Sequence, residues 1–237
     1  MKKIIGLLVL ASSFMLNAQT NPELLKHYEA YYKQMKLQGD VQGIINAMTH
    51  LNVLSPSQAR KDTLGYIYMS ENKYLQALNT LGIEKNNTDS DIATEVKAIS
   101  LKAVKQPKLA LTFFEELFKR SPNALLAYEL AELNMQLQNL TEVDKHIAYG
   151  MTNSKDDMKK AFYETQKPYE VSLKAAFTYL NAISIYTKDK KANLDAAIEI
   201  LENSLKIAPN FNLATIAKNE LQRQKQNALK PDSKAKN

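Results

Sequence analysis

The chain contains no cysteine among its 237 residues. Disulfides, thiol nucleophiles and thiolate metal sites are therefore excluded. Histidine is nearly as scarce, and His27, His50 and His146 lie far apart without a metal-ligand spacing. A chain of this size can build a core without disulfides, and its 45% of apolar residues is ordinary for a globular protein.

Catalytic motifs are also missing from the sequence. There is no GxSxG elbow, glycine-rich phosphate loop or HExxH pattern. Glu115-Glu116 and Asp156-Asp157 are adjacent carboxylates, and neighbouring residues of a helix do not face each other. The sequence therefore predicts no catalytic residues, no cofactor and no metal, and a protein that is not an enzyme.

Long hydrophobic runs are limited to the beginning of the chain. Lys2 and Lys3 precede an apolar run from Ile4 to Leu10, and Ala18 offers a small residue for cleavage. This layout predicts a signal peptide over residues 1–18. The alternative is a membrane anchor, but the apolar run is too short to span a bilayer comfortably. We expect an exported protein, periplasmic or secreted, and export argues against nucleic acid as a partner.

The positive net charge belongs to the two ends of the chain. The full chain carries +6, of which Lys2 and Lys3 contribute two and residues 222–237 contribute four. The body between these ends is formally neutral. Residues 222–237 are expected to form a basic, disordered tail, which could alternatively contact an anionic membrane surface.

What the sequence does contain is a periodic helical pattern. Pro56 and Pro122 close helical stretches 66 residues apart, which is two periods of 33, and Ala77 and Ala110 are one such period apart. A period in the low thirties with two helices in each repeat indicates a stacked helical solenoid. No stretch shows a strand period over a useful length, so the predicted fold class is all-α.

Individual repeats resemble the tetratricopeptide repeat (TPR) family, over most of residues 25–211. Leu64-Gly65 followed by Tyr68 matches the first helix of the family's unit, and Leu194 to Pro209 is a typical second helix. The resemblance implies a right-handed superhelical solenoid of about five repeats. The repeat domain is expected over residues 19–221, with repeats near 25–57, 58–90, 91–123, 124–151 and 169–211.

Two segments fall outside this rhythm. Residues 152–168 are an insertion, in which Ser154 and Asp157 resemble a capping box and Met158, Ala161 and Phe162 have helical spacing. We expect a short extra helix there. Residues 212–221 are expected to form a capping helix whose apolar face, with Leu213, Ile216, Ala217 and Leu221, closes the stack.

The family resemblance also implies a concave groove lined by the first helix of each repeat. The residues predicted to bind a partner there are Lys33, Lys36, Tyr66, Met69, Ile99, Lys102, Tyr128, Glu132 and Met135. Tyrosine and methionine are good contact residues, although some of these side chains could pack against neighbouring helices instead. The carboxylate clamp of chaperone-binding family members is not matched, so a free C-terminal carboxylate is not the predicted ligand.

These observations favour an exported TPR scaffold that binds a protein or peptide partner in the groove, without catalysis. One alternative is an envelope structural or spacer protein held to a membrane or cell wall by the basic tail. Another is a receptor for a small cell-wall fragment. The Asp62-Thr63-Leu64 triplet and the Leu16–Gln19 region resemble features of exported proteins of Bacteroidota. The sequence leaves the identity of the partner and the oligomeric state open.

Overall fold

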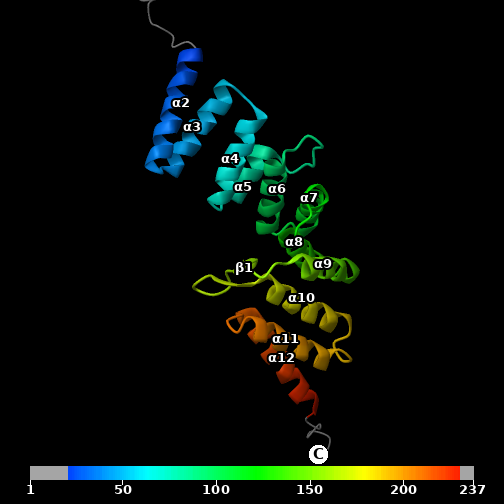
Figure 1. Ribbon diagram of the computed structural model, residues 1–237. Helices are drawn as coiled ribbons and strands as arrows, with labels where there is room; N and C mark the ends of the chain where they lie inside the picture. The colour runs from blue at the N-terminus through cyan, green and yellow to red at the C-terminus, as the bar shows by residue number, and fades with distance from the viewer. Residues whose placement is uncertain (1–20, 230–237) are drawn as a thin grey trace, which may run out of the picture. The chain divides into compact units, whose positions relative to one another are not determined.

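The computed structural model describes residues 21–229. The predicted signal peptide (residues 1–18) and the end of the basic tail (residues 230–237) lie outside the described residues. Within that range the chain forms eleven helices and one hairpin (Figure 1). The helices are α2 (Asn21–Gln38), α3 (Val41–Leu54), α4 (Gln58–Ser70), α5 (Tyr74–Leu81), α6 (Asp91–Ala103), α7 (Pro107–Arg120), α8 (Ala124–Gln136), α9 (Leu140–Asn153), α10 (Leu173–Lys188), α11 (Leu194–Ile207) and α12 (Asn212–Leu229). The strands are β1 (Lys159–Phe162) and β2 (Tyr169–Ser172).

The chain divides into two compact units at the junction of Val96 and Lys97, within α6. We call them the first unit (up to Val96) and the second unit (from Lys97). The helices within each unit pair as α2 with α3, α4 with α5, α8 with α9 and α10 with α11. These four pairs correspond to the repeats predicted near 25–57, 58–90, 124–151 and 169–211, and the predicted all-α repeat fold is confirmed.

Local sequence signals set the helix ends in the first unit. The Asp40 carboxylate accepts a hydrogen bond from the backbone N–H of Gly43 (2.9 Å), and the Ser57 hydroxyl accepts one from Arg60 (3.2 Å). Both are N-caps, which satisfy amides that have no partner inside the helix. Gly39 and Gly82 follow α2 and α5 with φ of +68° and +79°, values that glycine adopts without strain. A core of Ile45, Met48, Leu51 and Leu64 forms between the helices that these signals delimit.

The second unit has the larger core, and aromatic side chains fill much of it. Tyr128, Phe113, Phe177 and Phe211 are almost completely buried. The α9 backbone approaches α10 closely at Gly150, where a Cβ atom would collide with the ring of Phe177. Pro107 occupies the first position of α7, where its missing N–H costs nothing.

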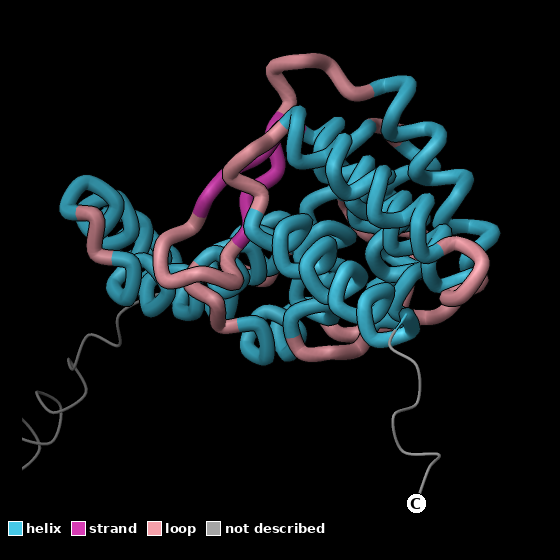
Figure 2. Tube along the Cα trace, turned by 90° about the horizontal axis from the view of Figure 1, so that it is seen from below, coloured by secondary structure: helices cyan, strands magenta, loops and turns pink. Residues whose placement is uncertain are grey.

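The expected extra helix in the insertion is wrong, because the segment forms an antiparallel hairpin. Lys160 pairs with Val171 and Phe162 with Tyr169, so these four residues share one face of β1 and β2. Phe162 and Val171 are buried on this face, against the core of the second unit. The two strands of the hairpin, magenta in Figure 2, thus contribute to the core. The fold is an all-α repeat fold with this one addition in the described residues.

The last helix differs from the prediction in its length and at one residue of its apolar face, since Leu213, Ala217 and Leu221 do pack against the core. It continues to Leu229, although we expected it to end at Leu221 and the tail to be disordered from residue 222. Arg223 pairs with Glu220 (2.7 Å) and Lys225 with Asp195 of α11 (2.8 Å), and these polar contacts extend the helix beyond its apolar pattern. Ile216, expected on the buried face, is 55% exposed, whereas Ala214 and Leu221 are buried.

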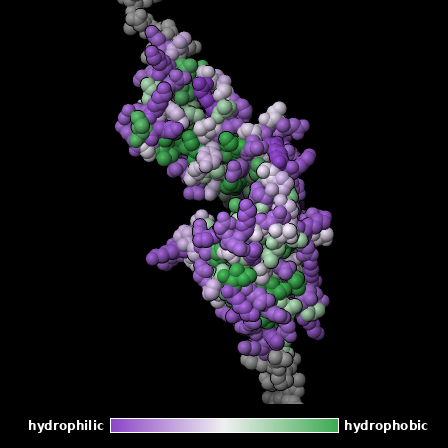
Figure 3. Space-filling model, in the orientation of Figure 1, coloured by the Kyte–Doolittle hydropathy of each residue, from purple (hydrophilic) through white to green (hydrophobic). Residues whose placement is uncertain are grey.

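None of the described helices has the length and apolar character needed to cross a membrane. Hydrophilic side chains predominate on the face shown in Figure 3, and the apolar ones gather in small separate patches. Such scattered apolar residues are normal for a protein surface.

Candidate partner-binding surfaces

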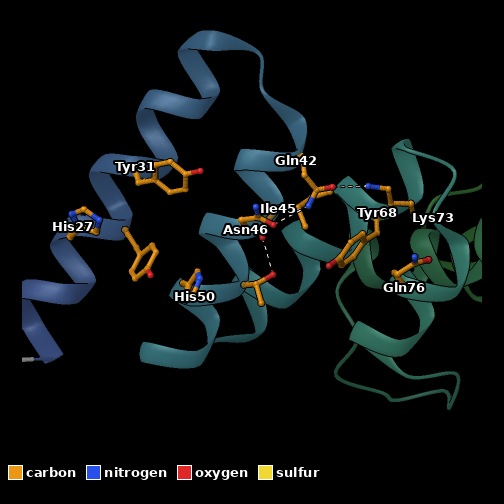
Figure 4. Close-up of a pocket in the computed structure, with 11 residues that line it drawn as sticks. His27, Tyr31, Gln42, Ile45, Asn46, His50, Tyr68, Lys73 and Gln76 are labelled. Carbon is orange, nitrogen blue, oxygen red and sulfur yellow. Dashed lines mark hydrogen bonds between the residues drawn. The ribbon is translucent and has the colours of Figure 1, made fainter.

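A cavity of about 710 Å³ lies in the first unit (Figure 4). It is lined by α2, by α3 and by residues of α4 and α5 with the turn between them. The lining residues are His27, Tyr28, Tyr31, Gln42, Ile45, Asn46, Thr49, His50, Tyr68, Lys73 and Gln76. The volume falls within the range of small-ligand sites.

Helix periodicity explains how two elements deliver most of these side chains. Gln42, Ile45, Asn46, Thr49 and His50 follow the spacing i, i+3, i+4, i+7, i+8, which places them on one stripe of α3. The side chains of α2 face this stripe, and Lys73 and Gln76 approach it from the beginning of α5 (Figure 4). The cavity therefore exists only when the helices are assembled.

The aromatic side chains of the cavity are ordered by contact with one another. The Tyr28 and His50 rings stack with their centroids 4.2 Å apart and an interplanar angle of 12°. His27 packs edge-on against Tyr28, with centroids 5.3 Å apart. Such aromatic contacts contribute beyond the burial of area. They order the side chains of one wall of the cavity.

A short chain of hydrogen bonds orders the polar side of the cavity. The Lys73 ammonium donates to the Gln42 side-chain oxygen (3.1 Å), and the Gln42 amide nitrogen donates to Asn46 (2.9 Å). The Thr49 hydroxyl donates to the carbonyl of Ile45 (2.8 Å). Figure 4 shows the Lys73–Gln42 bond at the rim between α3 and α5. The amides thus hold the one lysine of the lining in place.

The electrostatic character of the cavity is positive. Among the described residues that line it, Lys73 carries a full charge, two are histidines and none has a carboxylate. Lys73 is also the N-cap position of α5, which has no side-chain cap, so the partial positive charge of the helix start lies at the same rim. The cavity offers donors and aromatic faces to a ligand. In residues 21–229 no three His, Cys, Asp or Glu residues are grouped so that they could hold a metal ion.

The groove residues predicted in the first unit lie away from this cavity. None of Lys33, Lys36, Tyr66 and Met69 belongs to its lining. Lys33, Lys36 and Tyr66 are exposed and Met69 is half-buried. The three exposed side chains are accessible to a partner outside the cavity.

In the second unit the structure joins some of the predicted residues through a charge network. The Lys102 ammonium forms ion pairs with both Glu129 and Glu132, and Lys160 of the hairpin pairs with Glu129 (2.6 Å). Burial opposes ionisation of Glu129, but the charges and hydrogen bonds of Lys102 and Lys160 outweigh it, so the pKa of Glu129 lies below its ordinary value. Ile99 and Met135 are half-buried, like Lys102 and Glu132. We call Lys102, Glu129, Glu132 and Lys160 the charge network.

Tyr128 does not serve as a groove contact, and that prediction is corrected. Its side chain is 1% exposed. The ring packs edge-on against Phe177, with centroids 5.4 Å apart, and Lys160 covers it at 5.2 Å from the centroid. Burial raises the pKa of its hydroxyl well above the ordinary value. The hairpin, which the sequence did not predict, is what closes this position to a partner.

Comparison with known proteins identifies the fold. No protein-family model matches the chain, and no curated protein matches its sequence. Solved structures do match. YrrB, described as a TPR protein with an unusual peptide-binding site, is 15% identical with a TM-score of 0.63, over 88% of this chain and 97% of that one.

Two further structures agree with this match. A tetratricopeptide repeat protein from Parabacteroides merdae is also 15% identical, with a TM-score of 0.63 over 87% of this chain and 75% of that one. MamA from Desulfovibrio magneticus RS-1 is 14% identical, with a TM-score of 0.60 over 82% of this chain and 99% of that one. At such identities the likeness concerns the fold, and the fold is that of a TPR solenoid.

The cavity was missed from the sequence although part of its signal was present. The stripe of α3 has amides, a hydroxyl and a histidine around the buried Ile45. Polar residues at helical spacing are usually a solvated face, so the stripe alone does not indicate a cavity. Only the approach of Tyr28 from α2 and Lys73 from α5 makes this stripe the wall of a cavity.

Proposed function

We propose that this chain is an exported TPR scaffold that binds a segment of a partner protein, and that it acts by binding without catalysis. The observation that carries the proposal is the cavity of the first unit, a preformed hollow with aromatic and amide walls on a repeat fold. TPR solenoids present extended surfaces made of stacked helices. Aromatic rings and amides supply contact area and hydrogen bonds to a peptide.

The likeness to YrrB supports the same reading, because that protein is described as having a peptide-binding site. The exported location is supported by the predicted signal peptide at residues 1–18. Lys33, Lys36, Tyr66 and Met69 extend the proposal to a second contact surface on the first unit. The predicted contacts of the second unit are Ile99, Lys102, Glu132 and Met135.

Site-directed photocrosslinking in the native cells tests the proposal. A benzophenone amino acid replaces Tyr31, which lines the cavity, or Leu37, which is 85% exposed on the same helix and does not line it. We expect Tyr31 to give a discrete adduct with one protein, identified by mass spectrometry, that Leu37 does not give. Identical adducts from both positions, or none from Tyr31, would contradict partner binding at the cavity.

A further inference from the structure

We propose that the cavity of the first unit selects acidic peptide segments, with an Asp or Glu side chain of the partner seated at the Lys73 ammonium. This inference rests on the proposed function and adds the chemistry of the ligand. The proposed ligand is an Asp or Glu side chain within a segment of the partner, not a free C-terminal carboxylate. None of the groove residues predicted from the sequence lines this cavity.

The first step of the argument is the position of Lys73. Its ammonium lies at the cavity rim, 3.1 Å from the neutral side-chain oxygen of Gln42. No carboxylate of the described residues lines the cavity to balance this charge. A carboxylate from outside would form a charge-assisted hydrogen bond here, which is stronger than a bond between neutral groups. Gln42 already fixes the direction of the lysine, so little side-chain freedom is lost on binding.

The second step is that the acid-free lining is a local property of the cavity. Residues 21–96 contain seven lysines and arginines against nine aspartates and glutamates, so the first unit as a whole is not basic. The carboxylates of the first unit lie outside the lining. Asp40, for example, caps α3, and the Asp62 carboxylate accepts hydrogen bonds from the side chains of Ser90 and Gln58. Charge complementarity of this local kind gives specificity and correct orientation.

The third step is the match of the remaining walls to a peptide. The side chains of Asn46 and Gln76 carry both donors and acceptors, which suit the backbone of an extended segment. Tyr31 and Tyr68 add aromatic faces for its apolar atoms. A volume of about 710 Å³ accommodates a few residues rather than a whole domain. The ligand is therefore a short acidic segment.

Selection from a bead library of random ten-residue peptides by the full chain tests the proposal. The variant Lys73→Glu reverses the charge at the rim, and a glutamate at a helix start is favourable for folding. Lys61→Glu is the matched control, since Lys61 is exposed in the same unit, does not line the cavity and undergoes the same charge change. Circular dichroism checks that both variants remain helical.

We expect the wild-type chain to enrich Asp and Glu about twofold over the input library. An acidic peptide from this pool should lose about tenfold in affinity with Lys73→Glu and less than about twofold with Lys61→Glu. Equal losses in the two variants would overturn the proposal. If the selected peptides show no excess of Asp and Glu but crosslink to a benzophenone residue at position 31, the acidic preference is overturned and the proposed function stands. Selection of no peptide would overturn the inference, whereas the photocrosslinking result decides the proposed function separately.

Discussion

At the scale of single residues, Gly150 shows how close packing constrains the chain. A Cβ at this position would collide with the Phe177 ring, and both residues are buried. Overpacking typically costs about 1–3 kcal/mol, while replacing a helical glycine by alanine contributes about 1 kcal/mol of helix propensity. Because the ring is held in the core, we expect the collision to outweigh this gain, so that Gly150→Ala lowers the free energy of unfolding by up to about 2 kcal/mol in urea denaturation.

A second background separates the collision from other effects of this substitution. With Phe177→Leu the ring is gone, and Gly150→Ala should then be neutral or stabilising. If Gly150→Ala lowers the free energy of unfolding equally in both backgrounds, the collision is not its cause.

Glu129 carries a largely buried charge in the second unit. It pairs with Lys102 and Lys160, and its side chain is 20% exposed. The pKa of Glu129 is lower in the folded than in the unfolded chain. The contribution of its charge to the free energy of unfolding is therefore complete above the ordinary pKa of about 4.3, and it is lost as the pH falls through the folded pKa. We expect Glu129→Gln to cost about 1–3 kcal/mol at pH 7 and clearly less at pH 3, measured by chemical denaturation.

The exposed pair of Glu142 and Lys145 provides the control for this prediction. Glu142→Gln removes a surface ion pair of 2.6 Å and should change the free energy of unfolding by less than about 0.5 kcal/mol at pH 7. A loss for Glu129→Gln that is the same at both pH values would show that its charge is not responsible.

At the scale of elements, the hairpin is the part of the fold that the sequence did not reveal. Met158, Ala161 and Phe162 fit a helical spacing, whereas Lys160 and Phe162 also fit a strand. Two strands of four residues are too short for periodicity to decide between these readings. The decision comes from tertiary packing, since Phe162 meets Tyr169 of the other strand and Phe211, which lies 49 residues further along the chain.

Substitutions of two adjacent residues, Phe162 and Tyr163, test whether packing of the hairpin on the core stabilises the fold. Phe162 is 6% exposed and contacts Tyr128, Tyr169 and Phe211, while Tyr163 next to it is 75% exposed. We expect Phe162→Ala to cost about 3–5 kcal/mol in urea denaturation, and Tyr163→Ala less than about 0.5 kcal/mol. Similar small effects of both would mean that the hairpin lies on the core without stabilising it.

At the scale of the whole molecule, the repeat pattern was predictable and the cavity was not. Pro107 and the regular alanines and leucines of the repeats act within one or two neighbouring helices, so their spacing indicates the fold. The cavity combines side chains from α2 to α5, and the charge network combines α6, α8 and β1. Tyr128 illustrates the difference. Its helix was predicted correctly, but its burial depends on the hairpin residue Phe162, which lies 34 residues further along the chain.

Cleavage of the predicted signal peptide tests the proposed export of the molecule. A signal peptide needs a positive start, a short apolar run and a small residue before the cleaved bond, which Lys2, Ile4–Leu10 and Ala18 supply. Expression of the full chain in its native cells should give a protein that begins at Gln19, as measured by N-terminal sequencing and intact mass. Ala18→Tyr should block this cleavage because a large residue does not fit the cleavage site, whereas Ala18→Ser should preserve it. A wild-type protein that keeps Met1 and stays in the membrane fraction would instead support the anchor, and the partner would then have to be sought at the membrane surface.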